Sequence, residues 1–198
     1  MSPGRQETHQ HILIVAQKLF AAGGYDATGV AEICLQAGVS KGAFYHHFAS
    51  KHALFLELLD GWLASLDAGF ARAERQADDV PTALRQMADL VAAGIRRPEA
   101  QLPMMLEFWA QAQRDPAIWQ RAVEPYRKYQ AYFEQLIAQG VETGTIRPVP
   151  PRVAAIMLTS MAVGLLMQAQ FAPDSNEWGE AMRATVELFL EGLAGSQA

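Results

Sequence analysis

The chain has 198 residues, of which 51% are hydrophobic and 19% are charged, so it can bury a substantial core and is not a disordered segment. Its single cysteine, Cys34, excludes an intramolecular disulfide framework and a cysteine-based zinc site. The formal net charge of −5 divides into +1 for residues 1–55, which hold all five histidines, and −6 for the remainder, so the acidic charge belongs to the body of the chain.

Apolar residues with helical spacing open the chain, and strand signals are scarce throughout. One apolar stripe with spacing i, i+3, i+4, i+7, i+8 predicts an amphipathic helix that ends at Gly23-Gly24; it consists of Ile12, Val15, Ala16, Leu19 and Phe20. A short helix is expected at about 29–37, with Thr28 as its N-cap and Gly38 as its end. Ser40 caps another that reaches Phe48, and Ser50 caps a fourth at about 51–76.

Longer helices are expected in the rest of the chain. Prolines and glycines delimit them at about 82–96, 99–112, 116–142, 152–171 and 176–194, and Pro125 should kink or split the third of these. The prediction is an all-α protein of about nine helices, with a head at residues 1–50 and a helical-bundle body at 51–198. The apolar run Val153–Met167 is too short to span a bilayer and indicates a core helix, and a cytoplasmic protein is expected.

The two short helices around Gly38 meet the geometric demands of a DNA-reading helix-turn-helix. Cys34 supplies the small residue at the helix crossing, Gly38 can adopt a left-handed backbone, and apolar residues can pin both helices to a support; these are Ile33, Val39, Phe44 and Phe48. The second helix then presents outward a set of short, cationic and aromatic groups without any acid: Ser40, Lys41, Gly42, Ala43, Tyr45, His46 and His47. Lys51 opens the next helix, where it can hold one more phosphate.

The segment from Gly24 to Ala53, and most clearly AGVSKGAFYHHFASKHAL, resembles the DNA-binding head of the tetracycline-repressor (TetR) family. The stretches LEFWAQAQRDP and GVETGTI are similar to the regulatory half of that family, in its betaine-type branch. The resemblance implies that Thr28 and Lys51 contact phosphates, that Lys41, Gly42 and Ala43 face base edges, and that Tyr45, His46 and His47 reach the backbone. The chain departs from the family at Cys34, where alanine is usual, and at Ala49, where lysine is frequent.

Other chemistry in the same segment is disfavoured. The string Gly38-Val39-Ser40-Lys41-Gly42 matches the G-x-S-x-G elbow of hydrolases, but a helix precedes it and no histidine follows His52. Adjacent histidines such as His46 and His47 point about 100° apart on a helix and cannot chelate one ion together. A redox role for Cys34 is a minor alternative to a core position. No enzyme activity, metal or cofactor is expected.

The body carries residues suited to binding a small, largely apolar effector. Methionine adapts to irregular cavities, and the candidate lining residues are Met104, Met105, Phe108, Trp109, Trp119, Tyr126 and Met161. The last two helices, at 152–171 and 176–194, are apolar on more than one face, which favours burial under other helices or a two-fold dimer interface.

These observations and the resemblance together predict a homodimeric transcription regulator that binds a near-palindromic operator. The residues alone do not distinguish a repressor from an activator, and the resemblance implies a repressor that an effector releases from the operator. The alternative is a small-molecule-binding helical protein whose head contacts a protein partner.

Overall fold

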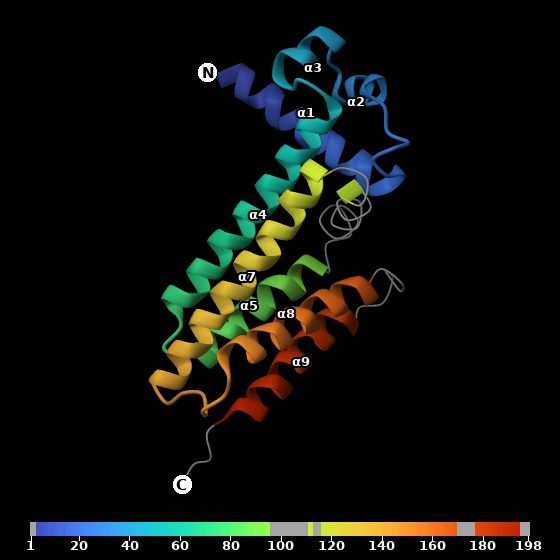
Figure 1. Cartoon of the computed structure of the whole chain (residues 1–198). Coiled ribbons are helices and arrows are strands. Elements are labelled where there is room, and N and C mark those ends of the chain that lie inside the picture. The colour runs from blue at the N-terminus through green and yellow to red at the C-terminus, as the bar shows by residue number, and fades with distance from the viewer. Residues whose placement is uncertain (1–2, 96–110, 113–115, 170–176, 195–198) are drawn as a thin grey trace. The chain divides into compact units, whose positions relative to one another are not determined.

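Helices make up nearly all of the regular structure. The computed structural model describes residues 3–95, 111–112, 116–169 and 177–194, and there the chain forms eight helices and no strand (Figure 1). The helices are α1 (Pro3–Gly23), α2 (Val30–Ala37), α3 (Lys41–His47), α4 (Lys51–Gln76), α5 (Val80–Ile95), α7 (Pro116–Glu142), α8 (Pro151–Gln168) and α9 (Glu177–Leu193). The predicted all-α class is confirmed, and the helix expected at 99–112 lies mostly outside the described residues.

Of the two effects predicted for Pro125, the split is wrong, because α7 continues through this proline as one helix of 27 residues, and the kink stays a prediction. Proline removes one N–H donor and crowds the preceding turn. Further along α7, the side chains of Phe133, Leu136 and Ile137 are buried and anchor this helix in the core.

The chain divides into two compact units, whose boundary falls within α4 after Ala64. In the first unit, α1, α2, α3 and the start of α4 enclose a small apolar core. Its fully buried members include Ile12, Phe20, Ile33, Phe44, Phe48, Leu54 and Phe55. The predicted stripe on α1 is thereby confirmed, because it supplies Ile12, Ala16 and Phe20 to this core. The domain boundary expected at residue 50 stays a prediction.

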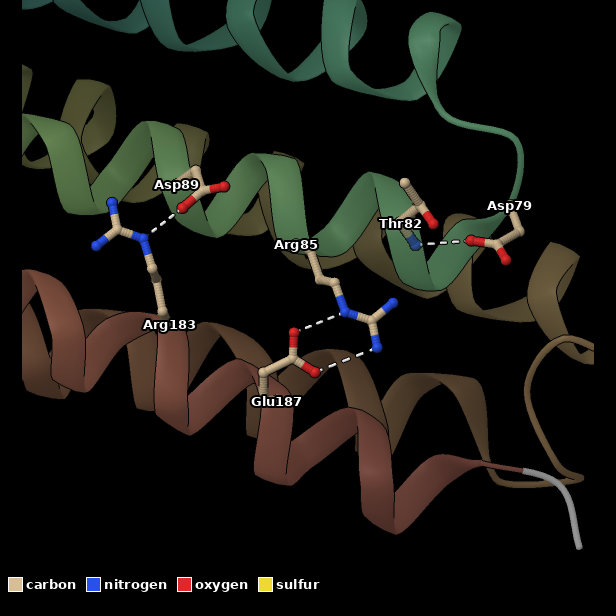
Figure 2. Close-up of polar contacts among 6 residues, drawn as sticks. All are labelled: Asp79, Thr82, Arg85, Asp89, Arg183 and Glu187. Atoms are coloured by element: carbon tan, nitrogen blue, oxygen red, sulfur yellow. Dashed lines mark hydrogen bonds and ion pairs between the residues drawn. The ribbon is translucent and has the colours of Figure 1, made fainter.

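In the second unit, α5 and α9 pack side by side and share the main apolar core with α7, α8 and the end of α4. Two ion pairs join the exposed side of α5 to that of α9, as Figure 2 shows. Arg85 binds both carboxylate oxygens of Glu187, at 2.6 and 3.2 Å, and Arg183 lies 2.5 Å from Asp89. Each helix offers one cation and one anion four residues apart, so only the antiparallel pairing satisfies all four charges.

Helix α8 is buried on one side and apolar on both. Ala154, Ala155 and Leu158 lie in the core, whereas Val153 and Met157 are 53% and 52% exposed. Among the described residues it is the one helix long and apolar enough to cross a membrane, a weak criterion that core helices of soluble proteins also meet. The predicted core helix therefore does contribute to the core, but only with one side, and 22% of its apolar window is buried.

Candidate nucleic-acid interface

A tight turn joins α2 to α3. Gly38 ends α2 with φ 63° and ψ 31°, the left-handed conformation that favours glycine, and Val39 N–H donates to the Cys34 carbonyl at 3.0 Å. Ser40 caps α3, because its Oγ accepts a hydrogen bond from Ala43 N–H at 3.1 Å. The predicted turn and the predicted Ser40 cap are both confirmed.

Buried side chains fix α2 and α3 against the rest of the first unit. Cys34 is 5% exposed on the inner side of α2, as expected for the small residue at the crossing, and Ile33 is fully buried. On the inner side of α3, Phe44 is also fully buried, and its ring lies 5.6 Å from that of Phe48. A hydrophobic anchor at both ends of the turn gives α3 a defined orientation.

The opposite side of α3 is open to solvent and carries no acidic group. Five of the seven predicted contact residues on and beside this helix are exposed, and the other two are partly buried. The exposed residues are Ser40, Lys41, Gly42, Tyr45 and His46, and the partly buried ones are Ala43 and His47. A short helix with a basic and aromatic outer side, held by an inner apolar side, is the arrangement that enters a DNA major groove.

Thr28 is placed differently from the prediction. Helix α2 begins at Val30, and the residue before it is Gly29, which makes no side-chain cap. Thr28 is 3% exposed, and its hydroxyl donates to the Gly24 carbonyl at 2.9 Å. The predicted N-cap role is therefore wrong. Carbonyl groups at the end of a helix lack helical partners, and the Thr28 hydroxyl donates to one of these at the end of α1. Its phosphate contact stays a prediction.

Lys51, expected to hold a phosphate, contacts the protein instead in this structure. Its Nζ atom donates to the carbonyls of Tyr25 at 2.7 Å and Thr28 at 2.9 Å, and it lies 4.1 Å from the centre of the Tyr25 ring. The Tyr25 ring in turn packs on Phe20 and Phe55 of the core. Lys51 therefore ties the α1–α2 connection to the start of α4, with one ammonium N–H left over for a phosphate.

Lys51→Met is expected to lower the free energy of unfolding by about 1–3 kcal/mol, because two carbonyls lose their donor while the side-chain length is kept. Chemical denaturation measures this change. Lys18→Met is the matched control, since Lys18 is exposed on α1, and it should leave stability within about 0.5 kcal/mol of the unmodified protein. Equal stability of the two variants would show that the Lys51 hydrogen bonds contribute nothing.

His9 was not among the predicted contact residues, although it lies beside them. Its ring stacks on Phe48 with centroids 4.6 Å apart, and His47 meets it edge-on at 5.7 Å. The signal was present in the sequence, because His9 precedes Ile12 by three residues and therefore continues the buried stripe of α1. In the part of the chain that the structure describes, no group of three histidine, cysteine or acidic side chains is arranged to hold a metal ion.

The predicted effector residues are only partly described. Met104, Met105, Phe108 and Trp109 lie outside the described residues. Trp119 and Tyr126 lie two turns apart on α7 and are 53% and 41% exposed, and Met161 packs against the core of the second unit. Their role in binding a ligand stays a prediction.

Two tyrosines on α7 bind acidic groups on α4 within the second unit. Tyr129 donates to Asp67 at 3.0 Å, beside the ion pair that Lys128 forms with the same carboxylate. About one turn further on α7 and two turns further on α4, Tyr132 donates to Glu74 at 2.7 Å. Burial, reinforced by these carboxylates, raises the pKa of both phenols, so they remain protonated donors. The carboxyl-terminal half of α4 is thereby fixed to α7.

The fold and the exposed α3 define a helix-turn-helix DNA-binding protein, and comparisons with known proteins identify its family. Residues 12–58 match the family of bacterial regulatory proteins described as tetR, and residues 80–195 match the C-terminal region of BetI-type transcriptional repressors. The chain belongs to the TetR family of DNA-binding transcriptional regulators. Regulators of this family bind operator DNA, dimerise and bind small-molecule effectors.

Individual relatives agree with this assignment. The regulator AcrR of Shigella flexneri is 30% identical over 94% of this chain and 89% of its own. The repressor KstR2 of Mycobacterium tuberculosis is 33% identical over 69% of this chain and 68% of its own. Among solved structures, the regulator PfmR of Thermus thermophilus is 28% identical, with a TM-score of 0.76. The match covers 93% of this chain and 99% of its own. These names indicate transcription regulators and not enzymes.

Proposed function

We propose that this protein is a homodimeric repressor that binds a near-palindromic operator through α3 of each head and leaves it when a small, largely apolar effector binds the body. The observation that carries this proposal is the outer side of α3, which is exposed, free of acids and held from behind by Phe44. Two such helices in a dimer would enter successive major grooves about 34–36 Å apart. Repression is the mode named for relatives such as KstR2.

Within each head, the contacts divide into positioning and base reading. Lys41 at the start of α3 is exposed and can reach a phosphate or a guanine, while Gly42 and Ala43 permit close approach to base edges and thymine methyls. Tyr45 and His46 lie farther along the exposed side and can donate to phosphates. Ser40 is committed to its cap, so its contribution is to orient α3.

The dimer would form through α8 and α9. Exposed apolar residues form one stripe along α8 and one position on α9: Val153, Ile156, Met157, Met167 and Leu188. Apolar surface arranged as a stripe along a helix is best covered by a second copy of the same helix, which gives a four-helix interface with two-fold symmetry.

Effector release would act through α4. This helix begins in the operator-binding head at Lys51, and its other end is bound to α7 by Asp67 and Glu74. An effector that displaces α7 would displace the α4 residues bonded to it and so alter the separation of the two heads. By linkage, such an effector weakens operator binding by the same factor by which the operator weakens effector binding, corresponding to about 1–3 kcal/mol.

The proposed DNA binding is tested by footprinting the protein on the DNA that flanks its own gene, followed by titrations at several salt concentrations. Protection of a near-palindromic site is expected, and Lys41→Ala should weaken binding and flatten the log–log salt slope by about 0.9 if Lys41 contacts one phosphate. Lys18→Ala, on the exposed side of α1, is the control. Absence of protected DNA would refute the proposal and favour a protein partner for the head.

A further inference from the structure

His9 of α1 lies where three helices of the first unit meet. Its Nε2 atom is 3.1 Å from Glu57 Oε1 on α4, and its ring stacks on Phe48, directly after α3, at an interplanar angle of 22°. The ring of His47, the last residue of α3, meets it edge-on at 5.7 Å. The His9 side chain is 17% exposed, so its position is set by packing. His9 therefore holds the end of α3 from behind.

Three groups that can carry a positive charge act on His47. His9 and Arg5 approach it from α1, and the ring of His46 lies 5.5 Å from it on α3. Glu57 on α4 pairs with His9. Partial burial, followed by the charges of His9, His46 and Arg5, lowers the pKa of His47. A proton on His47 is thus opposed in the free protein.

We propose that His9 is a positioning residue of the operator site, which sets the orientation and the charge of His47 at the end of the DNA-reading helix. This inference rests on the proposed function, because bound DNA supplies the phosphate that His47 would face. A phosphate beside α3 favours the imidazolium form of His47. Operator binding therefore takes up a proton at His47, and operator affinity rises as the pH falls.

The pKa of His47 in the free protein lies below the ordinary value of histidine, and a neighbouring phosphate raises that pKa in the complex. Between these two values the complex holds more protons than the free protein. Operator affinity then increases by up to about tenfold per subunit for each unit by which the pH falls. Well above the higher of the two pKa values, affinity is independent of pH. Replacing His9 with a residue that cannot carry a positive charge removes one of the causes that lower the pKa of His47.

The experiment measures the affinity of an operator duplex by fluorescence anisotropy between pH 5.5 and 8 at constant ionic strength. The unmodified protein should bind more tightly as the pH falls, and His47→Gln should lose most of this dependence. His9→Gln should shift the profile to higher pH. His9→Phe, which keeps the stacking on Phe48, should show the same shift. His11→Gln, at an exposed position on the same helix, is the matched control and should leave the profile unchanged.

A purely structural role of His9 predicts a different result, because His9→Phe would then restore the profile of the unmodified protein. That outcome overturns the inference, as does a pH-independent affinity of the unmodified protein, while DNA binding itself stands. If the protein binds no DNA from the region flanking its gene at any pH, the proposed function fails together with the inference. Circular dichroism at each pH verifies that each variant is folded. If His9→Gln does not fold, His9→Phe provides the test.

Discussion

Met157→Glu is expected to convert the dimer into a monomer and to weaken operator binding by about 100-fold or more. Met157 is 52% exposed in the apolar stripe on α8, beside Val153 and Ile156. In a two-fold interface through this stripe, each new carboxylate would lose its hydration and would lie near the same carboxylate of the second subunit, which repels it. A monomer would also bind with one head only. Joining two heads in one dimer raises operator affinity by a factor of about 10²–10⁴.

Sedimentation velocity measures the subunit state, and a gel shift measures operator affinity. Ala131→Glu is the matched control, because it places the same charge at an exposed position on α7, away from the stripe. The control should remain dimeric and bind the operator normally. If Met157→Glu also remains dimeric, the interface must lie elsewhere.

The part of the candidate DNA-binding site that could be predicted from the sequence depends on signals between residues that are close together in the chain. Gly38 indicates a left-handed residue, Ser40 a cap three residues before Ala43, and Phe44 and Phe48 one apolar side of a short helix. All three features are present, because backbone conformation and i, i+3 or i, i+4 contacts decide them locally. The exposed residues of α3 follow as the remainder of that helix.

The contacts that the sequence did not reveal join residues far apart in the chain. Lys51 reaches back to the carbonyls of Tyr25 and Thr28, and His9 reaches forward to His47 and Glu57. Each of these side chains has several possible partners in sequence, and only the packing of α1, α2 and α4 selects one. Thr28 illustrates this choice, since a cap on α2 and a bond to the end of α1 are both compatible with its sequence position.

The ends of the helices in the body could also be predicted, because local signals mark them. Prolines and glycines indicated the ends of α5, α7, α8 and α9 within a few residues. Hydrophobic spacing does not say which apolar side of a helix meets its own chain and which meets another copy. For α8 the burial of Ala154, Ala155 and Leu158 shows which side meets its own chain, and Val153 and Met157 lie on the exposed side that we propose a second copy covers.

Phe44→Ala is expected to lower the free energy of unfolding of the head by about 3–5 kcal/mol and to abolish operator binding. Phe44 is fully buried, with its ring 5.6 Å from that of Phe48, and its loss leaves a cavity behind α3. Helix α3 has seven residues and is too short to persist without this anchor. Chemical denaturation and a gel shift measure the two effects, and light scattering should show that the dimer persists, because the stripe on α8 is untouched.

Tyr45→Phe, one residue along the same helix, separates anchoring from contact with DNA. Tyr45 is 54% exposed, and its ring meets that of Phe44 edge-on at 5.3 Å, a contact that phenylalanine preserves. Stability should therefore change by less than about 0.5 kcal/mol. Loss of one hydroxyl donor to a phosphate should still weaken operator binding by about 10-fold or more. Phe44 is buried and Tyr45 is exposed. A Tyr45→Phe variant with unchanged affinity would therefore mean that the exposed side of α3 reads DNA without this hydroxyl.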